Sequence, residues 1–229
     1  MKSLCFSLIR LMWGLFLYSL GVVFAIKAYI GYPPWDVLHI GLANTFGISI
    51  GTISIILGIF IGLIAVLLGE KIGFGTILNM IFIGVFLDLV LSIQIIPVAN
   101  NFILGIAMLI IGLFIIAFAT YFYIGAALGA GPRDSLMVAL TRITGLPIGA
   151  CRGIIELLVV LSGWMLGGMV GIGTVLAAFG IGFCIQIVFN LLKFDATKIK
   201  HETIGHTYNK IFKKEIPEEI DKKEVFQNE

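Results

Sequence analysis

Two stretches of the chain decide its fold: Gly31–Leu38, which reads GYPPWDVL, and Gly129–Leu136, which reads GAGPRDSL. They lie 98 positions apart, and the same ungapped shift places GFGT at 73–76 on GIGT at 171–174. Matched Gly, Pro, Asp and Thr residues in one register indicate an internal repeat. Such a repeat defines the unit that folds.

The composition is that of a membrane protein. Of the 229 residues, 59% are hydrophobic, and the mean hydropathy of +1.10 lies far above that of soluble proteins. Most charges gather in the tail from Lys193 to Glu229, where the two signs balance. No basic stripe is left to bind nucleic acid.

Roughly 20 apolar residues cross a hydrocarbon core of about 30 Å. Six runs reach about that length: Leu8–Ala28, Ile50–Leu68, Gly75–Gln94, Phe102–Ile124, Ile148–Leu166 and Thr174–Leu192. The first run is too long for a signal-peptide core, so we expect it to be retained. The sequence therefore predicts an all-α polytopic membrane protein with about six transmembrane helices.

Two shorter helical stretches, Pro33–Phe46 and Pro132–Thr144, occupy equivalent places in the repeat. A dozen residues at 1.5 Å each reach roughly 18 Å, about half a membrane. We therefore predict two three-helix repeats, each with a short half-membrane helix. The alternative is that both stretches cross fully, which gives eight spans and parallel repeats.

The predicted domains are a first membrane repeat at 1–97, a second at 98–192 and a polar cytoplasmic tail at 193–229. With the N-terminus in the cytoplasm, almost all basic residues fall on the cytoplasmic side and only Lys27 lies outside, as the positive-inside rule requires. Three spans are an odd number, so the second repeat is expected to enter the membrane from the opposite face. Both termini are then cytoplasmic.

Each short stretch begins with proline followed by aspartate two residues later. Pro34 and Pro132 suit the first helical position, and Asp36 and Asp134 then oppose the positive end of the helix dipole. Helix initiation alone explains both aspartates. The functional alternative is that they line a pathway and bind a cation, a proton or a polar substrate, because a carboxylate in lipid is costly unless it faces protein or water.

Other polar residues are also candidates for this pathway. They are Trp35, His39, Asp88, Arg133 and Gln186. Asp88 lies deep in the third span, where a carboxylate is a functional candidate, although snorkelling or an interhelical bond also explains it. His39 lies one turn from Asp36 and could hydrogen-bond it. Arg133 either neutralises Asp134 or anchors the chain at the cytoplasmic surface.

Glycines at four-residue spacing give small faces on which membrane helices pack, and a homo-oligomer could form through them. A separate set is read as flexible starts of the third and sixth spans and hence as hinge candidates: Gly73, Gly75, Gly171 and Gly173. These do not continue into a dinucleotide-binding fingerprint. Three cysteines without a CxxC spacing predict neither disulfides nor a metal site, and we expect no cofactor.

The run GYPPWDVLHIGL at 31–42, the run GAGPRDSL at 129–136 and the twin G-x-G-T elements resemble the YczE/YyaS/YitT-like family of bacterial integral membrane proteins. The similarity covers roughly residues 8–192. It implies a repeat-containing protein of the plasma membrane, and supplies neither a substrate nor site residues.

Inverted repeats with broken helices are typical of secondary transporters, whose ligand sites lie near the membrane midplane. We therefore expect a transporter of a small molecule or ion, with the lipid bilayer as its other partner. A passive channel and a non-transporting assembly or regulatory protein are the alternatives. An enzyme is not expected, because no Ser/His pair, clustered histidines or close acid pair is readable from the spans.

Overall fold

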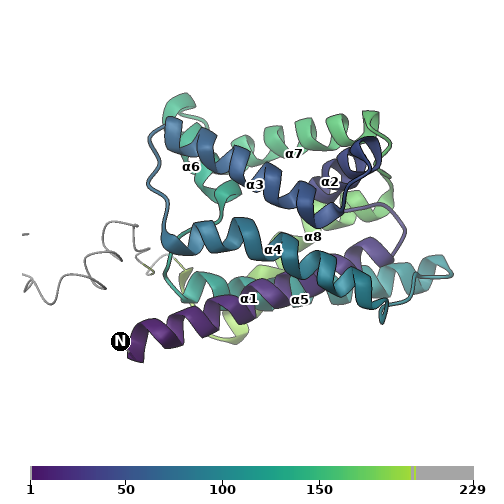
Figure 1. The fold of residues 1–229 in the computed structure, drawn as a ribbon, viewed down its shortest axis with the longest axis horizontal. Helices are drawn as coiled ribbons and strands as arrows, with labels where there is room; N and C mark the ends of the chain where they lie inside the picture. The colour runs from purple at the N-terminus through teal and green to yellow at the C-terminus, as the bar shows by residue number, and fades with distance from the viewer. Residues whose placement is uncertain (1, 197–198, 200–229) are drawn as a thin grey trace, which may run out of the picture.

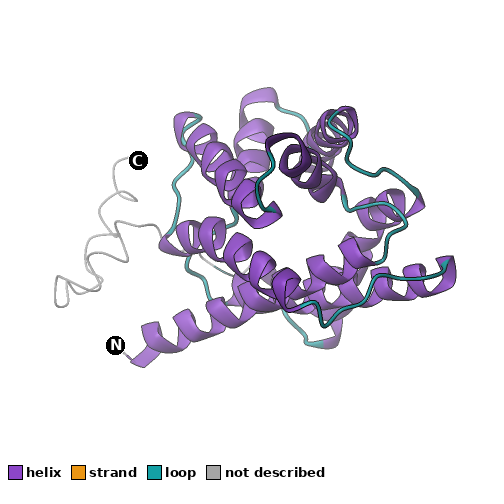
Figure 2. Ribbon diagram, turned by 45° about the vertical axis from the view of Figure 1, so that its right-hand side comes forward, coloured by secondary structure: helices purple, strands orange, loops and turns teal. Residues whose placement is uncertain are grey.

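The computed structural model describes residues 2–196 and 199. Within those residues the protein consists of helices and loops, without a strand (Figure 2). The eight described helices are α1 (Lys2–Lys27), α2 (Pro34–Phe46), α3 (Ile50–Leu67), α4 (Phe74–Ile93), α5 (Phe102–Gly125), α6 (Pro132–Thr144), α7 (Ile148–Met165) and α8 (Ile172–Leu191). Nearly all of the predicted tail lies outside the described residues, and the domain boundaries stay a prediction.

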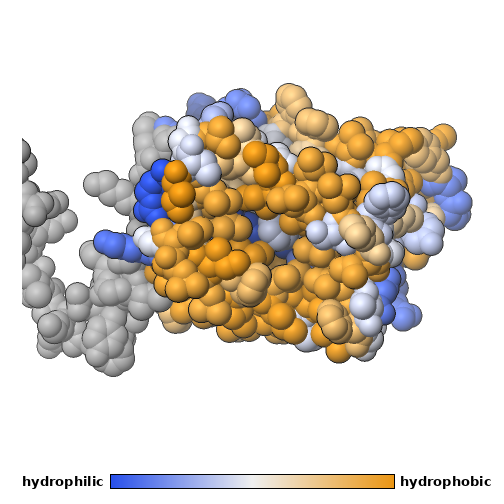
Figure 3. Space-filling model, turned by 90° about the horizontal axis from the view of Figure 1, so that it is seen from above, coloured by the Kyte–Doolittle hydropathy of each residue, from blue (hydrophilic) through white to orange (hydrophobic). Residues whose placement is uncertain are grey.

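Six of the described helices are long and apolar enough to cross a membrane, which confirms the six predicted spans. Their bounds agree within about two residues, except that α1 begins at Lys2 instead of near Leu8. An apolar surface covers the middle of the molecule, and hydrophilic residues gather mainly toward the ends of its long axis (Figure 3). This distribution is what a bilayer requires of the surface it surrounds.

The centre of the bundle is the contact between α1 and α5, which occupy equivalent places in the two repeats. A Cβ added at Gly21 would lie 2.7 Å from the carbonyl oxygen of Gly112, and one added at Gly112 would lie 2.7 Å from the carbonyl oxygen of Gly21. A side chain at either position would push the backbones apart. The helices therefore approach at the distance that only glycine permits.

The same contact shows that α1 and α5 run antiparallel. Gly14 packs beside Phe122, whereas Gly21, later in α1, packs beside Gly112, earlier in α5. The contacts also repeat under the 98-residue shift. A Cβ added at Gly14 would lie 3.1 Å from the Cβ of Phe122. A Cβ added at Gly112, the repeat partner of Gly14, would lie 3.1 Å from the Cβ of Phe24, the repeat partner of Phe122. Equivalent residues thus make equivalent contacts across the pair.

The remaining helices pack around this pair. α4 packs on α1, and α8 packs on α5. Each short helix also packs against a long helix of the other repeat: α2 packs on α7, and α6 packs on α3. In Figure 1, α2 and α6 lie at opposite ends of the long axis. The short helices therefore join one repeat to the other.

Both short helices are bounded by residues that suit helix ends. Pro34 and Pro132 occupy the first turn, where a missing N–H costs nothing. Gly47, with φ of 68°, and Gly145, with φ of 72°, end them in the left-handed conformation that favours glycine. Each helix begins at a buried proline and ends among exposed residues. The first turns of both helices are therefore placed inside the protein.

We expect Gly21→Ala to destabilise the protein by about 1–3 kcal/mol, because its Cβ would overlap the backbone of α5. Gly153→Ala is the matched control, since no atom lies within 4 Å of an added Cβ there and alanine favours helix by up to about 1 kcal/mol. Thermal unfolding in detergent measures both. Equal stability of the two variants would contradict the close packing of α1 and α5.

Candidate functional site

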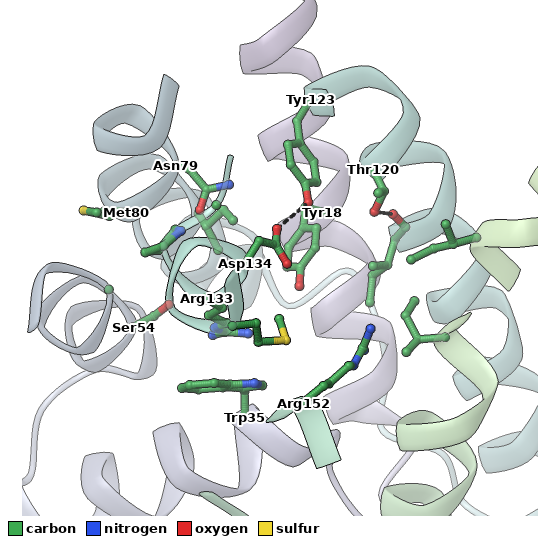
Figure 4. A pocket seen from close by; sticks show the side chains of 18 of the residues that line it. Tyr18, Trp35, Ser54, Asn79, Met80, Thr120, Tyr123, Arg133, Asp134 and Arg152 are labelled. Atoms are coloured by element: carbon green, nitrogen blue, oxygen red, sulfur yellow. Dashed lines mark hydrogen bonds between the residues drawn. The ribbon is translucent and has the colours of Figure 1, made fainter. Parts of the chain in front are cut away.

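The first turns of α2 and α6 meet near the centre of the molecule. An Nη2 atom of Arg133 lies 3.2 Å from Nε2 of His39, and Nδ1 of His39 lies 3.2 Å from Oδ1 of Asp36. The Arg133 guanidinium also lies over the Trp35 ring, 4.3 Å from the ring centroid (Figure 4). This cluster of Trp35, Asp36, His39 and Arg133 is called the central junction below.

The central junction links equivalent positions of the two repeats. Trp35 and Arg133 are 98 residues apart, so the cation–π contact joins a residue to its own repeat partner. The predicted contact between His39 and Asp36 is confirmed. Arg133, for which we considered a role at the surface or beside Asp134, instead reaches across to the first repeat.

The two equivalent aspartates have different surroundings. Asp36 is only 5% exposed, whereas Asp134 is exposed, although it accepts a hydrogen bond from the Tyr123 hydroxyl at 3.3 Å (Figure 4). His39 supplies the partner in the first repeat, and its repeat equivalent is Met137. Asp36 is thus bonded to an imidazole on its own helix, whereas Asp134 is bonded to a phenol that α5 supplies. No side chain caps α2 or α6 among the described contacts, so Asp36 is held chiefly by His39.

Two cavities lie on either side of the central junction. The larger, of about 160 Å³, includes Asp134 and Tyr123, and the smaller, of about 90 Å³, includes Asp36 and His39. Since a water molecule takes roughly 30 Å³ of liquid volume, each can hold several waters or a small solute. In Figure 3, paler and blue atoms lie in a hollow in the middle of the apolar face.

The cavities are repeat images of each other. Every residue that lines the larger cavity has its repeat partner in the lining of the smaller one, except Tyr123 and Glu156. The shared wall contains the stacked Trp35 and Arg133 and the α7 residue Arg152 (Figure 4). The two cavities therefore have equivalent linings under the 98-residue shift, and their aspartates differ in exposure.

The helices beside the cavities are packed differently in the two repeats. In the first repeat Gly51 of α3 lies directly against Gly84 of α4. Asp88 closes this contact: its Oδ1 accepts from the Gly51 N–H at 2.8 Å, and its Oδ2 accepts from the Ser49 hydroxyl at 2.5 Å. Of the three explanations considered for Asp88 (a pathway residue, snorkelling and an interhelical bond), the structure shows the interhelical bond.

The second repeat lacks this contact among the described residues. Gly149 and Gly182, the repeat partners of Gly51 and Gly84, have no atom within 4 Å of an added Cβ. Gln186, the partner of Asp88, is exposed. The α3–α4 contact is therefore closed, while α7 and α8 are apart at the equivalent place.

The hinge candidates lie where the repeats cross. The Gly75 N–H donates to the carbonyl of Leu128 at 2.7 Å, and its repeat partner Gly173 donates to the carbonyl of Ile30 at 2.8 Å. Gly73 and Gly171 pack beside the loops that precede α6 and α2, respectively. These glycines permit close backbone contact, and their role as hinges stays a prediction.

Several cavity residues were not identified from the sequence as part of the site. They are Tyr18, Ser54, Thr120 and Tyr123, together with the pair Arg152 and Glu156. Arg152 and Glu156 form an i, i+4 ion pair at 2.8 Å, and that spacing by itself indicates only a local contact on one helix. The sequence does contain a hint that this pair lines the cavity. The repeat partners of Arg152 and Glu156 are Ser54 and Gly58, whose small side chains leave room between the helices at the same depth. Among the described residues no group of three or more His, Cys, Asp or Glu side chains could hold a metal ion.

Comparison with known proteins agrees with this architecture. Residues 5–190 match the sequence profile of DUF6198, a family of unknown function. The chain is 34% identical over 175 residues to the uncharacterised membrane protein YczE of Bacillus subtilis, covering 76% of this chain and 80% of YczE. It is 35% identical over 182 residues to an uncharacterised protein of Haemophilus influenzae, covering 80% of this chain and 83% of that protein.

No solved structure matches the chain. The matched region contains all six long helices, the central junction and both cavities. The family profile spans most of the chain, and two relatives exceed one third identity over at least three quarters of it. The chain therefore belongs to the DUF6198 family of YczE-like membrane proteins.

Proposed function

We propose that this protein is a secondary transporter that moves a small polar molecule or ion across the bacterial plasma membrane by alternating access. The observation that carries the proposal is the pair of repeat-related cavities, one with an exposed aspartate and one with a buried aspartate. Alternating access needs two conformations of similar energy. A repeated architecture supplies them, because each repeat can adopt the arrangement of the other.

The packing of the helices supports the same mechanism. The α3–α4 pair is in contact, and the equivalent α7–α8 pair is separated, at glycines that are repeat partners. One kind of helix pair thus occurs in a closed and an open arrangement. In the second conformation α7 would close on α8 through Gly149 and Gly182, and α3 would leave α4. The antiparallel α1–α5 pair is what inverted repeats require, and the short helices are then half-membrane segments that enter from opposite faces.

The orientation follows from charge. Basic residues concentrate on the side of the N-terminus, so we place both termini in the cytoplasm. The exposed Asp134 then faces the cytoplasm, and the structure corresponds to the inward-open conformation. Substrate binding between the two aspartates would place the solute against the central junction, near mid-depth.

The two conformations can be tested with paired cysteines in a protein whose native Cys5, Cys151 and Cys184 are replaced by alanine. A Cβ at Gly58 would lie 3.5 Å from the Cβ of Met80, which suits a disulfide, so Gly58→Cys with Met80→Cys reports the closed α3–α4 contact. The repeat-equivalent pair is Glu156→Cys with Ala178→Cys. We expect each pair to cross-link on its own in membranes.

The decisive variant carries both cysteine pairs. In the two-conformation exchange proposed here, α3 leaves α4 when α7 closes on α8, so either disulfide is expected to form but never both in one molecule. Intact mass after tagging of the remaining thiols counts the disulfides. Molecules with both disulfides, or complete failure of the second pair to cross-link, would contradict the proposal.

Transport itself is tested in proteoliposomes offered labelled amino acids, organic acids and inorganic ions one at a time. We expect Asp36→Asn and Asp134→Asn each to reduce uptake of the transported solute by about tenfold or more, a change of about 1.4 kcal/mol in the barrier. Glu70→Gln is the control, because Glu70 pairs with Arg142 away from both cavities. Uptake at the unmodified rate in both aspartate variants would limit these residues to starting their helices.

A further inference from the structure

His39 is the one described histidine, and it is almost completely buried, with 2% of its surface exposed. It lies between a carboxylate and a guanidinium, 3.2 Å from each. The arginine and the aspartate come from different repeats, so the imidazole forms the hydrogen-bonded link between α2 and α6. Any change of its protonation acts on the contact between the repeats.

The partners determine the protonation state of His39. A guanidinium only donates hydrogen bonds and keeps its charge, so Nε2 of His39 must accept from Arg133. The proton of the neutral ring is then on Nδ1, which donates to the Asp36 carboxylate. The contact between α2 and α6 therefore exists in this form only while the imidazole is neutral.

We propose that His39 is the proton-binding site of the transporter, and that a proton bound there releases Arg133 from the central junction. The proton bonds to the lone pair of Nε2 and converts the imidazole to imidazolium. Nε2 then becomes a donor that faces the Arg133 N–H, and two like charges oppose each other. Nδ1–H continues to donate to the Asp36 carboxylate.

The surroundings of His39 favour this outcome. The titratable groups that line its cavity are Asp36 on α2, Tyr18 from α1, Arg133 from α6, and Arg152 and Glu156 from α7. The lining residues from α4, α5 and α8 are apolar. Glu156 is already paired with Arg152, so Arg133 is the group that a new positive charge displaces.

The site exists in one repeat only, because Met137 occupies the position equivalent to His39. Proton binding therefore acts on one of the two conformations and not equally on both. A ligand shifts a two-state equilibrium only when it binds the two states differently. The proton is such a ligand here, and coupling of transport to the proton gradient follows. This inference rests on the proposed transport function, whereas its test does not require transport.

The Trp35 ring reports the event, because Arg133 stacks on it. Trp13 and Trp164 are 52% and 62% exposed, so Trp13→Phe and Trp164→Phe leave Trp35 as the single tryptophan, which is excited selectively over tyrosine, in the full-length protein in nanodiscs. We expect its emission to change in one transition between about pH 8 and about pH 5, the range of histidine titration. His39→Gln should abolish the transition, and His201→Gln with His206→Gln should leave it unchanged.

A second measurement uses the unsubstituted ring and so does not depend on how well a variant folds. In ¹⁵N-histidine spectra of the full chain, the signal assigned to His39 should show the Nδ1–H tautomer at high pH and imidazolium at low pH. An absent transition, a ring that never titrates, or a transition that survives in His39→Gln but is lost in Glu156→Gln would overturn the proposal.

The two hypotheses fail separately. If the cysteine pairs show mutually exclusive closure and His39 does not titrate, transport stands and proton binding at His39 is wrong. If His39 titrates and Arg133 leaves the Trp35 ring while both disulfides form together, proton binding stands and the proposed two-conformation exchange is wrong.

Discussion

Backbone contact between α1 and α5 holds the two repeats together, and the positions of the other helices follow from it. Gly21 and Gly112 let the helices approach so closely that the carbonyl oxygen of each glycine would lie only 2.7 Å from a Cβ added to the other. Association of helices in lipid depends on such close packing, because lipid is as apolar as the side chains. With this pair in place, α4 and α8 cover its sides, and the loops before α2 and α6 reach across to the opposite repeat.

The crossing brings charge into the interior. An arginine and two aspartates at membrane depth are tolerated only with partners or water. Arg133 has both an aromatic face and a histidine acceptor, each supplied by the other repeat. The polar groups therefore add to the contact between the repeats that the glycines begin. They also give that contact two states, because hydrogen bonds to His39 depend on its proton.

The repeats match in sequence register but differ in helix packing, and the proposed function is based on this difference. Identical packing in both would give a symmetric bundle with two equal cavities. Instead α3 and α4 are locked by Asp88, and α7 and α8 are apart beside an exposed Gln186. In the proposed mechanism, a side chain that differs between the repeats, such as His39 against Met137, decides which conformation a bound proton favours.

The sequence by itself determined the fold class and the helix positions, because apolar length, proline and glycine act locally and recur 98 residues later. It also indicated Asp36 and Asp134, which line the two cavities of the candidate site. Only the tertiary structure decided that Arg133 hydrogen-bonds His39, that the Tyr123 hydroxyl donates to Asp134, and that α7 and α8 are apart. These depend on which helix faces lie together across the two repeats, and spacing along one chain carries no information on contacts between helices so far apart.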